Sequence, residues 1–301
     1  MDTAEMTARI AAGNGFIAAL DQSGGSTPKA LQGYGISDSA WSNDEEMFGL
    51  IHDMRTRIIT APAFNGSKVF GAILFERTMD SEIQGKPAPQ ALIARKVIPF
   101  LKIDKGLEAE TNGVQLMKPM PGLEKLLARA RGLGIYGTKE RSVINGANRA
   151  GIAAIVAQQI EVGRQVLAAG LVPILEPEVN IKSPDRAESD AILLDELTRG
   201  LSAMPGNDQV MLKLSLPVKA GLFDALVDHP RVMRVVALSG GYNRPDACTE
   251  LAKNRGVVAS FSRALLEDLR FQMTDDEFNA ALASAIDEIY KASTVKVAGV
   301  S

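Results

Sequence analysis

Eight short apolar segments alternate with longer amphipathic segments along the chain, and this alternation constrains the fold more than any other feature. Apolar runs of this kind, bounded by turn residues, are typical of buried strands. The eight runs are "FIAALD" (16–21), "GAILFE" (71–76), "PFLKID" (99–104), "GIYGTK" (134–139), "LVPILEPE" (171–178), "VMLKLS" (210–215), "VMRVVALSG" (232–240) and "VVASFSR" (257–263). Between them, apolar residues recur at helical spacing in segments such as 44–60, 123–132, 152–170, 190–204 and 221–229. Because strand then helix, repeated eight times, is the pattern of a (β/α)8 TIM barrel, and 301 residues accommodate one with insertions, we predict this α/β fold.

Nothing in the sequence divides this barrel. No shift in composition, proline-rich linker or long run of like charge interrupts residues 1–301, which we therefore expect to form one domain. A closing helix is expected after Thr274, because Thr274 and Glu277 have the spacing of a capping box.

Composition and charge exclude several classes of protein. The chain is 46% hydrophobic and 23% charged, as globular proteins are, and its net charge of −3 provides no general basic field for nucleic acid. An anionic ligand therefore needs a local cluster of donors. The first residues, "MDTAEMTARIAAGNG", include two acids and no long apolar run, and no later stretch reaches about 18 apolar residues. We therefore expect a cytoplasmic protein without a membrane partner.

The sequence offers little for a metal or an organic cofactor. Cys248 is the only cysteine, which excludes an internal disulfide, and the two histidines, His52 and His229, are far apart. A zinc site built from histidines is therefore not expected. The pattern "GLGIYG" (132–137) matches a dinucleotide-binding motif, but its last glycine falls inside an expected strand instead of opening a helix.

Polar residues stand at or near the C-terminal end of each expected strand, where (β/α)8 barrels carry their catalytic groups. They are Asp21, Glu76, Lys102, Asp104, Lys139, Glu176, Glu178, Lys213, Ser239, Ser260 and Arg263. The spacings from Lys139 to Glu176 and from Glu176 to Lys213 are both 37 residues, which is one strand-helix unit. We therefore expect these three residues on successive strands at similar height in the barrel.

Lys213 is the most unusual of these residues, because it interrupts the buried strand "VMLKLSLP" (210–217). A lysine near a strand end usually extends to solvent, but the other polar strand ends favour a functional role. Burial and a neighbouring cation both disfavour the ammonium form, and a neutral lysine attacks carbonyl carbon. The chemistry predicted is Schiff-base formation, with Glu176 and Glu178 placed to move protons. The loops "LSGGYNR" and "SFSRA" follow the last two strands, where barrels commonly bind phosphate.

Together with their neighbours, these residues resemble one known family. The segments "FIAALDQSGGSTPKAL", "GAILFERTMD", "PFLKIDKG", "GTKERS", "LVPILEPEVN", "LKLSLP", "VVALSGGYNR" and "ASFSRAL" look like class I fructose-bisphosphate aldolase, in particular its compact bacterial form, from about residue 14 to residue 291. The resemblance implies a metal-independent enzyme without an organic cofactor. It would cleave fructose 1,6-bisphosphate reversibly to dihydroxyacetone phosphate and glyceraldehyde 3-phosphate, in glycolysis and gluconeogenesis. Members of the wider family commonly associate, so the resemblance leaves a homo-oligomer open.

Carried over residue by residue, the resemblance assigns a role to each position. Lys213 would be the Schiff-base nucleophile, Glu176 the acid/base of imine formation, and Asp21 the base that takes the C4 hydroxyl proton. Glu178 and Lys139 would complete the charged network. The residues that match those near the aldehyde-side phosphate are Ser23, Ser26, Lys102 and Arg141. Those that match the ketone-side phosphate site are Ser239, Gly240, Gly241, Ser260 and Arg263.

Two departures from the animal members of this family are visible. Ser262 stands where the animal enzymes have glycine in the strand-eight motif. The final residues, "KVAGVS", lack the terminal tyrosine to which proton exchange at the enamine is assigned in the animal enzymes. The resemblance therefore does not identify the group that protonates the enamine here.

Three alternatives remain open on the sequence. A Schiff-base barrel of transaldolase type would use a lysine on the fourth strand, and Lys139 is available there. A zinc-dependent aldolase would need a metal site that the two histidines do not supply. A binding or scaffold role could exist in addition, but it would not explain lysines and glutamates at the strand ends.

Overall fold

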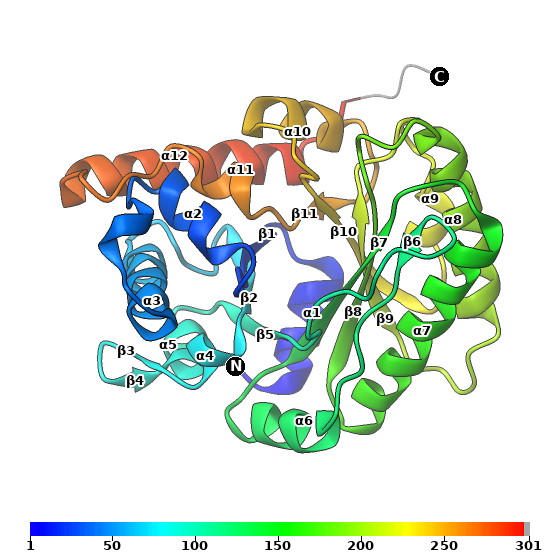
Figure 1. Ribbon diagram of the computed structural model, residues 1–301, viewed down its shortest axis with the longest axis horizontal. Helices are drawn as coiled ribbons and strands as arrows, with labels where there is room; N and C mark the ends of the chain where they lie inside the picture. The colour runs from blue at the N-terminus through cyan, green and yellow to red at the C-terminus, as the bar shows by residue number, and fades with distance from the viewer. Residues whose placement is uncertain (298–301) are drawn as a thin grey trace.

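The computed structural model describes residues 1–297 and shows a (β/α)8 barrel, which confirms the predicted fold (Figure 1). Within these residues, eight parallel strands follow one another in chain order. They are β1 (Phe16–Leu20), β2 (Val69–Leu74), β5 (Ile98–Lys102), β7 (Gly137–Ile144), β8 (Val172–Val179), β9 (Val210–Ser215), β10 (Val232–Leu238) and β11 (Val258–Ala259). A backbone hydrogen bond of 3.0 Å from Ala19 N to Phe261 O joins β1 to the segment after β11. Residues 298–301, at the end of the segment "KVAGVS" considered above, lie outside the described residues.

Helices surround the barrel (Figure 1). The longer ones are α2 (Thr27–Gly33), α3 (Asp44–Thr60), α5 (Ala88–Ala94), α6 (Leu123–Gly132), α7 (Arg149–Ala168), α8 (Arg186–Ser202), α10 (Arg244–Ala252) and α12 (Asp275–Thr294). Shorter elements in the loops are η1 (Asp38–Ala40), α4 (Glu76–Met79), β3 (Glu82–Ile83), β4 (Lys86–Pro87), β6 (Val114–Gln115), α9 (Asp224–Val227) and α11 (Arg263–Leu266). The predicted capping box at Thr274 and Glu277 is present. No helix among the described residues is long and apolar enough to span a membrane.

The inside of the barrel is packed with apolar side chains, and its N-terminal end is closed by helix α1 (Thr3–Ala12). Met6 and Ile10 of α1 pack into the same buried cluster as Phe100 and Met211 from the strands. Arg234 of β10 donates hydrogen bonds to carbonyl oxygens at the end of α1 and just after it. Because this end is closed, the charged side chains that point into the barrel meet at its C-terminal end.

The fourth strand lies further along the chain than the apolar pattern predicted. That pattern placed it at 134–139, whereas β7 covers Gly137–Ile144. Gly134 belongs to the turn after α6 and has a φ of +90°, a backbone conformation that only a residue without a side chain adopts readily. The polar run "KERS" (139–142) therefore lies inside the strand. Its side chains alternate between the charged interior of the barrel and a buried position under α7.

This shift changes the register of Lys139. In the β7–β8 pairing, Lys139 lies beside Ile174, and Arg141 lies beside Glu176. The register of β8 and β9 agrees with the predicted similar height of Glu176 and Lys213, whereas the backbone of Lys139 lies two residues nearer the N-terminal end than Glu176. The long side chain of Lys139 nevertheless reaches Glu176, with Nζ 2.9 Å from Oε2.

Candidate active site

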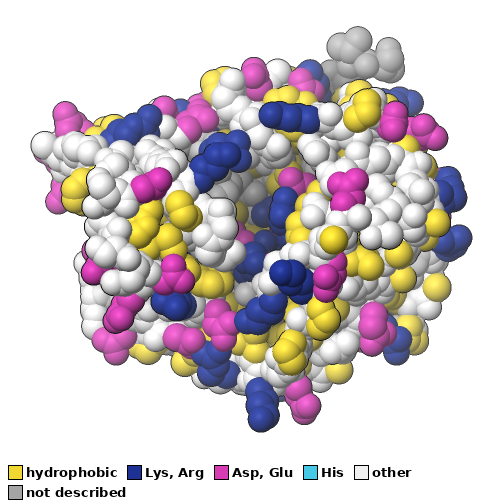
Figure 2. Space-filling view, viewed as in Figure 1, with side chains coloured by type: hydrophobic (Ala, Val, Ile, Leu, Met, Phe, Trp, Pro, Cys, Tyr) yellow, Lys and Arg dark blue, Asp and Glu magenta, His cyan; other side chains and the backbone are white. Residues whose placement is uncertain are grey.

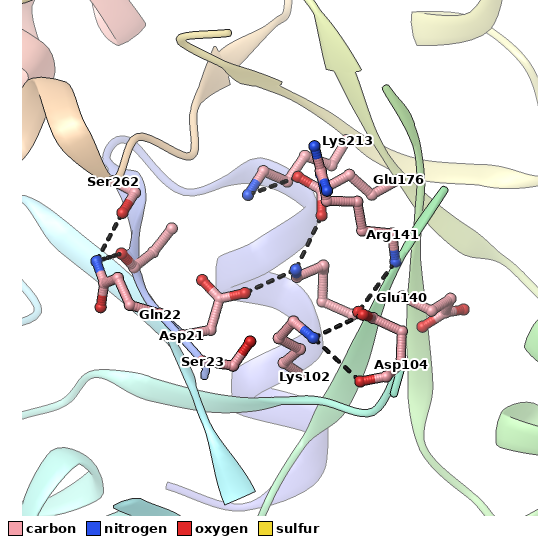
Figure 3. Close-up of polar contacts among 12 residues, drawn as sticks. Asp21, Gln22, Ser23, Lys102, Asp104, Glu140, Arg141, Glu176, Lys213 and Ser262 are labelled. Carbon is pink, nitrogen blue, oxygen red and sulfur yellow. Dashed lines mark hydrogen bonds and ion pairs between the residues drawn. The ribbon is translucent and has the colours of Figure 1, made fainter. Parts of the chain in front are cut away.

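Four charged side chains form a buried ion-pair network at the C-terminal end of the barrel (Figure 3). Lys139 Nζ lies 2.6 Å from Asp21 Oδ2 and 2.9 Å from Glu176 Oε2. Lys213 Nζ lies 3.0 Å from the other oxygen, Glu176 Oε1. Lys139, Glu176 and Lys213 are only 2%, 3% and 4% exposed, so water hardly screens these charges. The structure thus brings together Asp21, which directly follows β1, with residues of β7, β8 and β9, and Glu176 bridges the two lysines.

The network favours the charged form of three of its members. Burial alone would raise the pKa of Asp21, but Lys139 and Lys213 hold it well below its usual range. The same balance, burial against the two lysines, lowers the pKa of Glu176. For Lys139, burial lowers the pKa, but Asp21 and Glu176 outweigh it and raise the pKa above that of a free lysine. Lys139 is therefore an ammonium ion between two carboxylates.

A second charged group lies beside the first. Lys102 Nζ donates to Asp104 Oδ1 at 2.6 Å, and the other oxygen of Asp104 accepts from the backbone N–H of Arg141 at 3.2 Å. Arg141 Nε lies 2.5 Å from Glu178 Oε2. The structure therefore pairs Glu178 with Arg141. Each of these residues lies two positions nearer the C-terminal end of its strand than Glu176 and Lys139. Space-filling Figure 2 shows Lys and Arg side chains gathered around a hollow near the centre of the molecule, which is the local cluster of cations that an acidic chain needs for an anionic ligand.

The loops after β10 and β11 approach one another. Gly240 and Gly241 have φ angles of +62° and +121°, conformations in which a side chain would be strained. The guanidinium of Arg263 lies against this turn: a Cβ atom added to Gly241 would be 3.9 Å from Arg263 Nη1. Ser239 is buried at the start of the same turn. Backbone N–H groups and one exposed guanidinium are thus available to an anion at this position.

The three remaining serines of the predicted site differ in their contacts. Ser260 Oγ is buried and has no hydrogen-bond partner among the residues described, so it is free to bind a ligand. Ser23 and Ser26 lie in the turn between β1 and α2, where Ser26 Oγ accepts from the N–H of Ser23 at 3.1 Å. Ser23 is two residues after Asp21 in the chain.

Arg55 of α3 is a residue at the site that the sequence prediction missed. It is 1% exposed, and its Nη2 donates to the carbonyl oxygen of Gln22, next to Asp21, at 2.5 Å. Burial lowers the pKa of Arg55 to about 10, although Asp21 acts in the opposite direction. One signal existed in the sequence, since Arg55 lies on the apolar face of α3 with Ile51 and Ile58.

Glu140 was also missed, and it lies on the opposite side of β7 from the charged network. Figure 3 shows its side chain directed away from Lys102 and Asp104. It is fully buried; its backbone carbonyl accepts from Gln159 of α7 at 3.1 Å. Burial raises the pKa of this carboxyl well above its ordinary value. Its side chain forms no ion pair among the described residues, so we expect its replacement to act mainly on stability.

We expect Glu140→Gln to become more stable than the unsubstituted chain as pH rises. Because the folded-state pKa of Glu140 is raised, its carboxyl loses its proton in the unfolded chain from about pH 4.5 upward but keeps it in the folded protein. The unsubstituted protein therefore loses stability as pH rises from about 4.5 to the folded-state pKa. Glutamine does not titrate, so the difference in unfolding free energy should grow by up to about 1.4 kcal/mol per pH unit. Urea unfolding of both proteins between about pH 5 and pH 7.5 measures it. Curves that stay parallel would show that Glu140 is not held neutral.

Among the described residues, no group of three or more His, Cys, Asp and Glu side chains is arranged to hold a metal ion. The groups that line this site are amines and carboxylates. A buried lysine next to a shared carboxylate is suited to nucleophilic attack and proton transfer. The fold and the site together define a (β/α)8-barrel protein with two buried lysines paired to carboxylates at the C-terminal end of the barrel.

Comparison with known proteins makes the assignment more specific. The family model described as fructose-bisphosphate aldolase class-I matches residues 2–193, and the chain belongs to this family. The matched range contains Asp21, Lys139 and Glu176 and ends before Lys213. The chain is thus an aldolase by family.

Solved structures share the fold. The fructose-bisphosphate aldolase of Plasmodium falciparum, in a ternary co-crystal with TRAP and a small-molecule inhibitor, matches with a TM-score of 0.83 and 19% identity, over 98% of this chain and 95% of that one. A protein from Corynebacterium glutamicum matches with a TM-score of 0.54 and 14% identity, over 97% of this chain and 91% of that one. At these identities the matches establish the barrel fold.

Proposed function

We propose that the chain is a class I fructose-1,6-bisphosphate aldolase that forms a Schiff base on Lys213, without a metal or an organic cofactor. The observation that carries the proposal is the position of Glu176, with one oxygen 3.0 Å from Lys213 Nζ and the other 2.9 Å from Lys139 Nζ. A carboxylate placed there accepts the proton that Lys213 must lose and returns it as water leaves the carbinolamine. Membership of the aldolase family supports the same chemistry.

The contacts of the two lysines favour Lys213 as the nucleophile. Lys139 has carboxylates on two sides, and its raised pKa keeps it protonated. An ammonium ion has no lone pair with which to attack a carbonyl. In the described residues Lys213 is paired with Glu176 alone. Lys139 is better suited to hold Asp21 and Glu176 in place and to stabilise negative charge.

The proposed reaction uses these groups in the following order. Neutral Lys213 attacks C2 of the open-chain ketose, and loss of water leaves a protonated imine. Asp21 takes the C4 hydroxyl proton, the C3–C4 bond breaks, and its electron pair moves to C3 and the imine as an enamine. Glyceraldehyde 3-phosphate leaves. Protonation of the enamine and hydrolysis of the imine then release dihydroxyacetone phosphate and restore Lys213.

We assign two groups of residues to the substrate phosphates. On the ketone side, Arg263 and the backbone of Gly240 and Gly241 lie together, with the buried Ser239 and Ser260 nearby in the same two loops. A guanidinium binds phosphate through two parallel hydrogen bonds. On the aldehyde side we assign Lys102, Arg141, Ser23 and Ser26.

The proposal includes a place in the cell. This reaction interconverts a six-carbon bisphosphate with two three-carbon phosphates, so we assign it to glycolysis and gluconeogenesis in the cytoplasm. Light scattering of the purified protein would determine whether it forms the homo-oligomer that the resemblance leaves open.

Trapping of the imine tests the proposed function directly. Borohydride reduces an imine to a stable secondary amine, so treatment with borohydride and dihydroxyacetone phosphate should inactivate the protein and add the three-carbon unit to the peptide containing "VMLKLS". Mass spectrometry of the digested protein locates the adduct. An adduct on Lys139 would assign the chain to the transaldolase-type alternative. Absence of any adduct, with turnover sensitive to EDTA, would replace the Schiff base by metal chemistry.

A further inference from the structure

The first and the last strand of the barrel meet at a junction that separates two parts of the proposed site. Asp21 directly follows β1 and precedes Gln22, while Ser262 precedes Arg263 at the start of α11. Across this junction, Gln22 Nε2 donates a hydrogen bond of 2.7 Å to Ser262 Oγ (Figure 3). The contact therefore joins the residue next to the proposed base with the residue next to the proposed phosphate ligand.

Arg55 fixes the orientation of the Gln22 amide. Its Nη2 donates to Gln22 O at 2.5 Å and to Gln22 Oε1 at 3.2 Å, and its Nη1 donates to Thr78 Oγ1 at 2.8 Å. A guanidinium only donates hydrogen bonds, so the amide oxygen of Gln22 must face Arg55 and the amide nitrogen must face Ser262. Arg55 is 1% exposed, which makes it a rigid support for this arrangement.

Ser262 and Arg263 need such support. Arg263 opens a helix of only four residues, and its side chain is exposed although the neighbouring Ala264 and Leu265 are buried. An arginine that binds an anion from a mobile segment loses more conformational entropy than one already held in place.

We propose that the Gln22–Ser262 hydrogen bond, supported by Arg55, is a positioning device that holds Arg263 ready to bind the ketone-side phosphate. Gln22, Ser262 and Arg55 are positioning residues in this proposal, which rests on the proposed function. The device has no ion-pair contact with Lys213 or Glu176 among the described residues. It therefore acts on phosphate affinity and leaves the capacity of Lys213 to form an imine intact.

The test measures the concentration of dihydroxyacetone phosphate that gives half-maximal adduct formation at a fixed borohydride concentration. Ser262→Ala should raise this concentration about 3- to 10-fold, as expected for the loss of one hydrogen bond, with the same final amount of adduct. Ser262→Thr keeps the hydroxyl and should restore the original value. Arg263→Ala, the positive control, should raise the concentration at least as much as Ser262→Ala.

Ser142 provides a matched control. It accepts a hydrogen bond of 2.8 Å from Gln159 Nε2, so it belongs to another buried glutamine–serine pair, located under α7 away from the site. Ser142→Ala should leave the half-maximal concentration unchanged. Gln22→Ala removes the proposed hydrogen bond from its other side. The double variant with Ser262→Ala should have a half-maximal concentration no higher than that of the single variant with the larger effect, because both substitutions remove the same contact.

The outcomes distinguish this proposal from the proposed function. An unchanged half-maximal concentration in Ser262→Ala, an equal rise in Ser142→Ala, or additive effects in the double variant would each overturn the positioning device while leaving the aldolase assignment in place. Absence of any adduct in the unsubstituted protein would overturn both.

Discussion

Lys213→Ala is expected to form no borohydride-trapped adduct and to lose turnover down to the background of the uncatalysed reaction. The methyl group of alanine has no amine to attack the ketone, and the only other lysine in the network, Lys139, is held as an ammonium ion by Asp21 and Glu176. The variant should fold, because Glu176 keeps Lys139 at 2.9 Å and is not left without a cation. Mass spectrometry of the trapped protein and a coupled assay of cleavage measure the two losses.

Lys213→Arg separates nucleophilicity from charge in the same experiment. Arginine retains a cation for Glu176 but stays protonated, so it forms no imine. It should therefore be as inactive as Lys213→Ala while unfolding at a denaturant concentration closer to that of the unsubstituted protein. Turnover that persists in either variant would exclude Lys213 as the nucleophile.

Glu176→Gln is expected to lower turnover by about 10²- to 10⁴-fold, the usual cost of removing a positioned acid or base. Glutamine fills the same space, but it neither accepts the proton of Lys213 nor returns it to the departing hydroxyl. It also leaves Lys213 without its carboxylate, whereas Lys139 keeps Asp21 at 2.6 Å. Imine formation should therefore slow in single-turnover experiments, and the loss should appear in kcat.

Glu140→Gln is the matched control for this substitution. Glu140 is also a fully buried glutamate and is adjacent to Lys139 in sequence, but it faces α7 and lies outside the charged network. Its replacement should leave kcat unchanged. If Glu176→Gln forms the imine at the original rate, Glu176 has no part in that step and the proton must be transferred elsewhere.

The order of residues along the chain was enough to predict the barrel and most of the charged centre. Apolar runs that alternate with amphipathic segments admit few other folds, and parallel strands bring their C-terminal ends to one edge. Asp21, Lys139, Glu176 and Lys213 could therefore be grouped before any distance was known. The boundary of the fourth strand was predicted wrongly because polar residues buried inside a barrel do not show the apolar pattern of ordinary strands.

Only the tertiary structure decided how these groups pair. Lys139 pairs with two carboxylates and Lys213 with one. This difference depends on strand register and on side-chain positions at distances of about 3 Å, which sequence spacing does not resolve. The same holds for Arg55, which is far from Gln22 in sequence but donates hydrogen bonds to it, while Gln22 in turn donates to Ser262 across the junction of β1 and β11. Local patterns reflect burial and chain direction, whereas contacts between distant segments arise when the barrel closes and the packed side chains fix their neighbours.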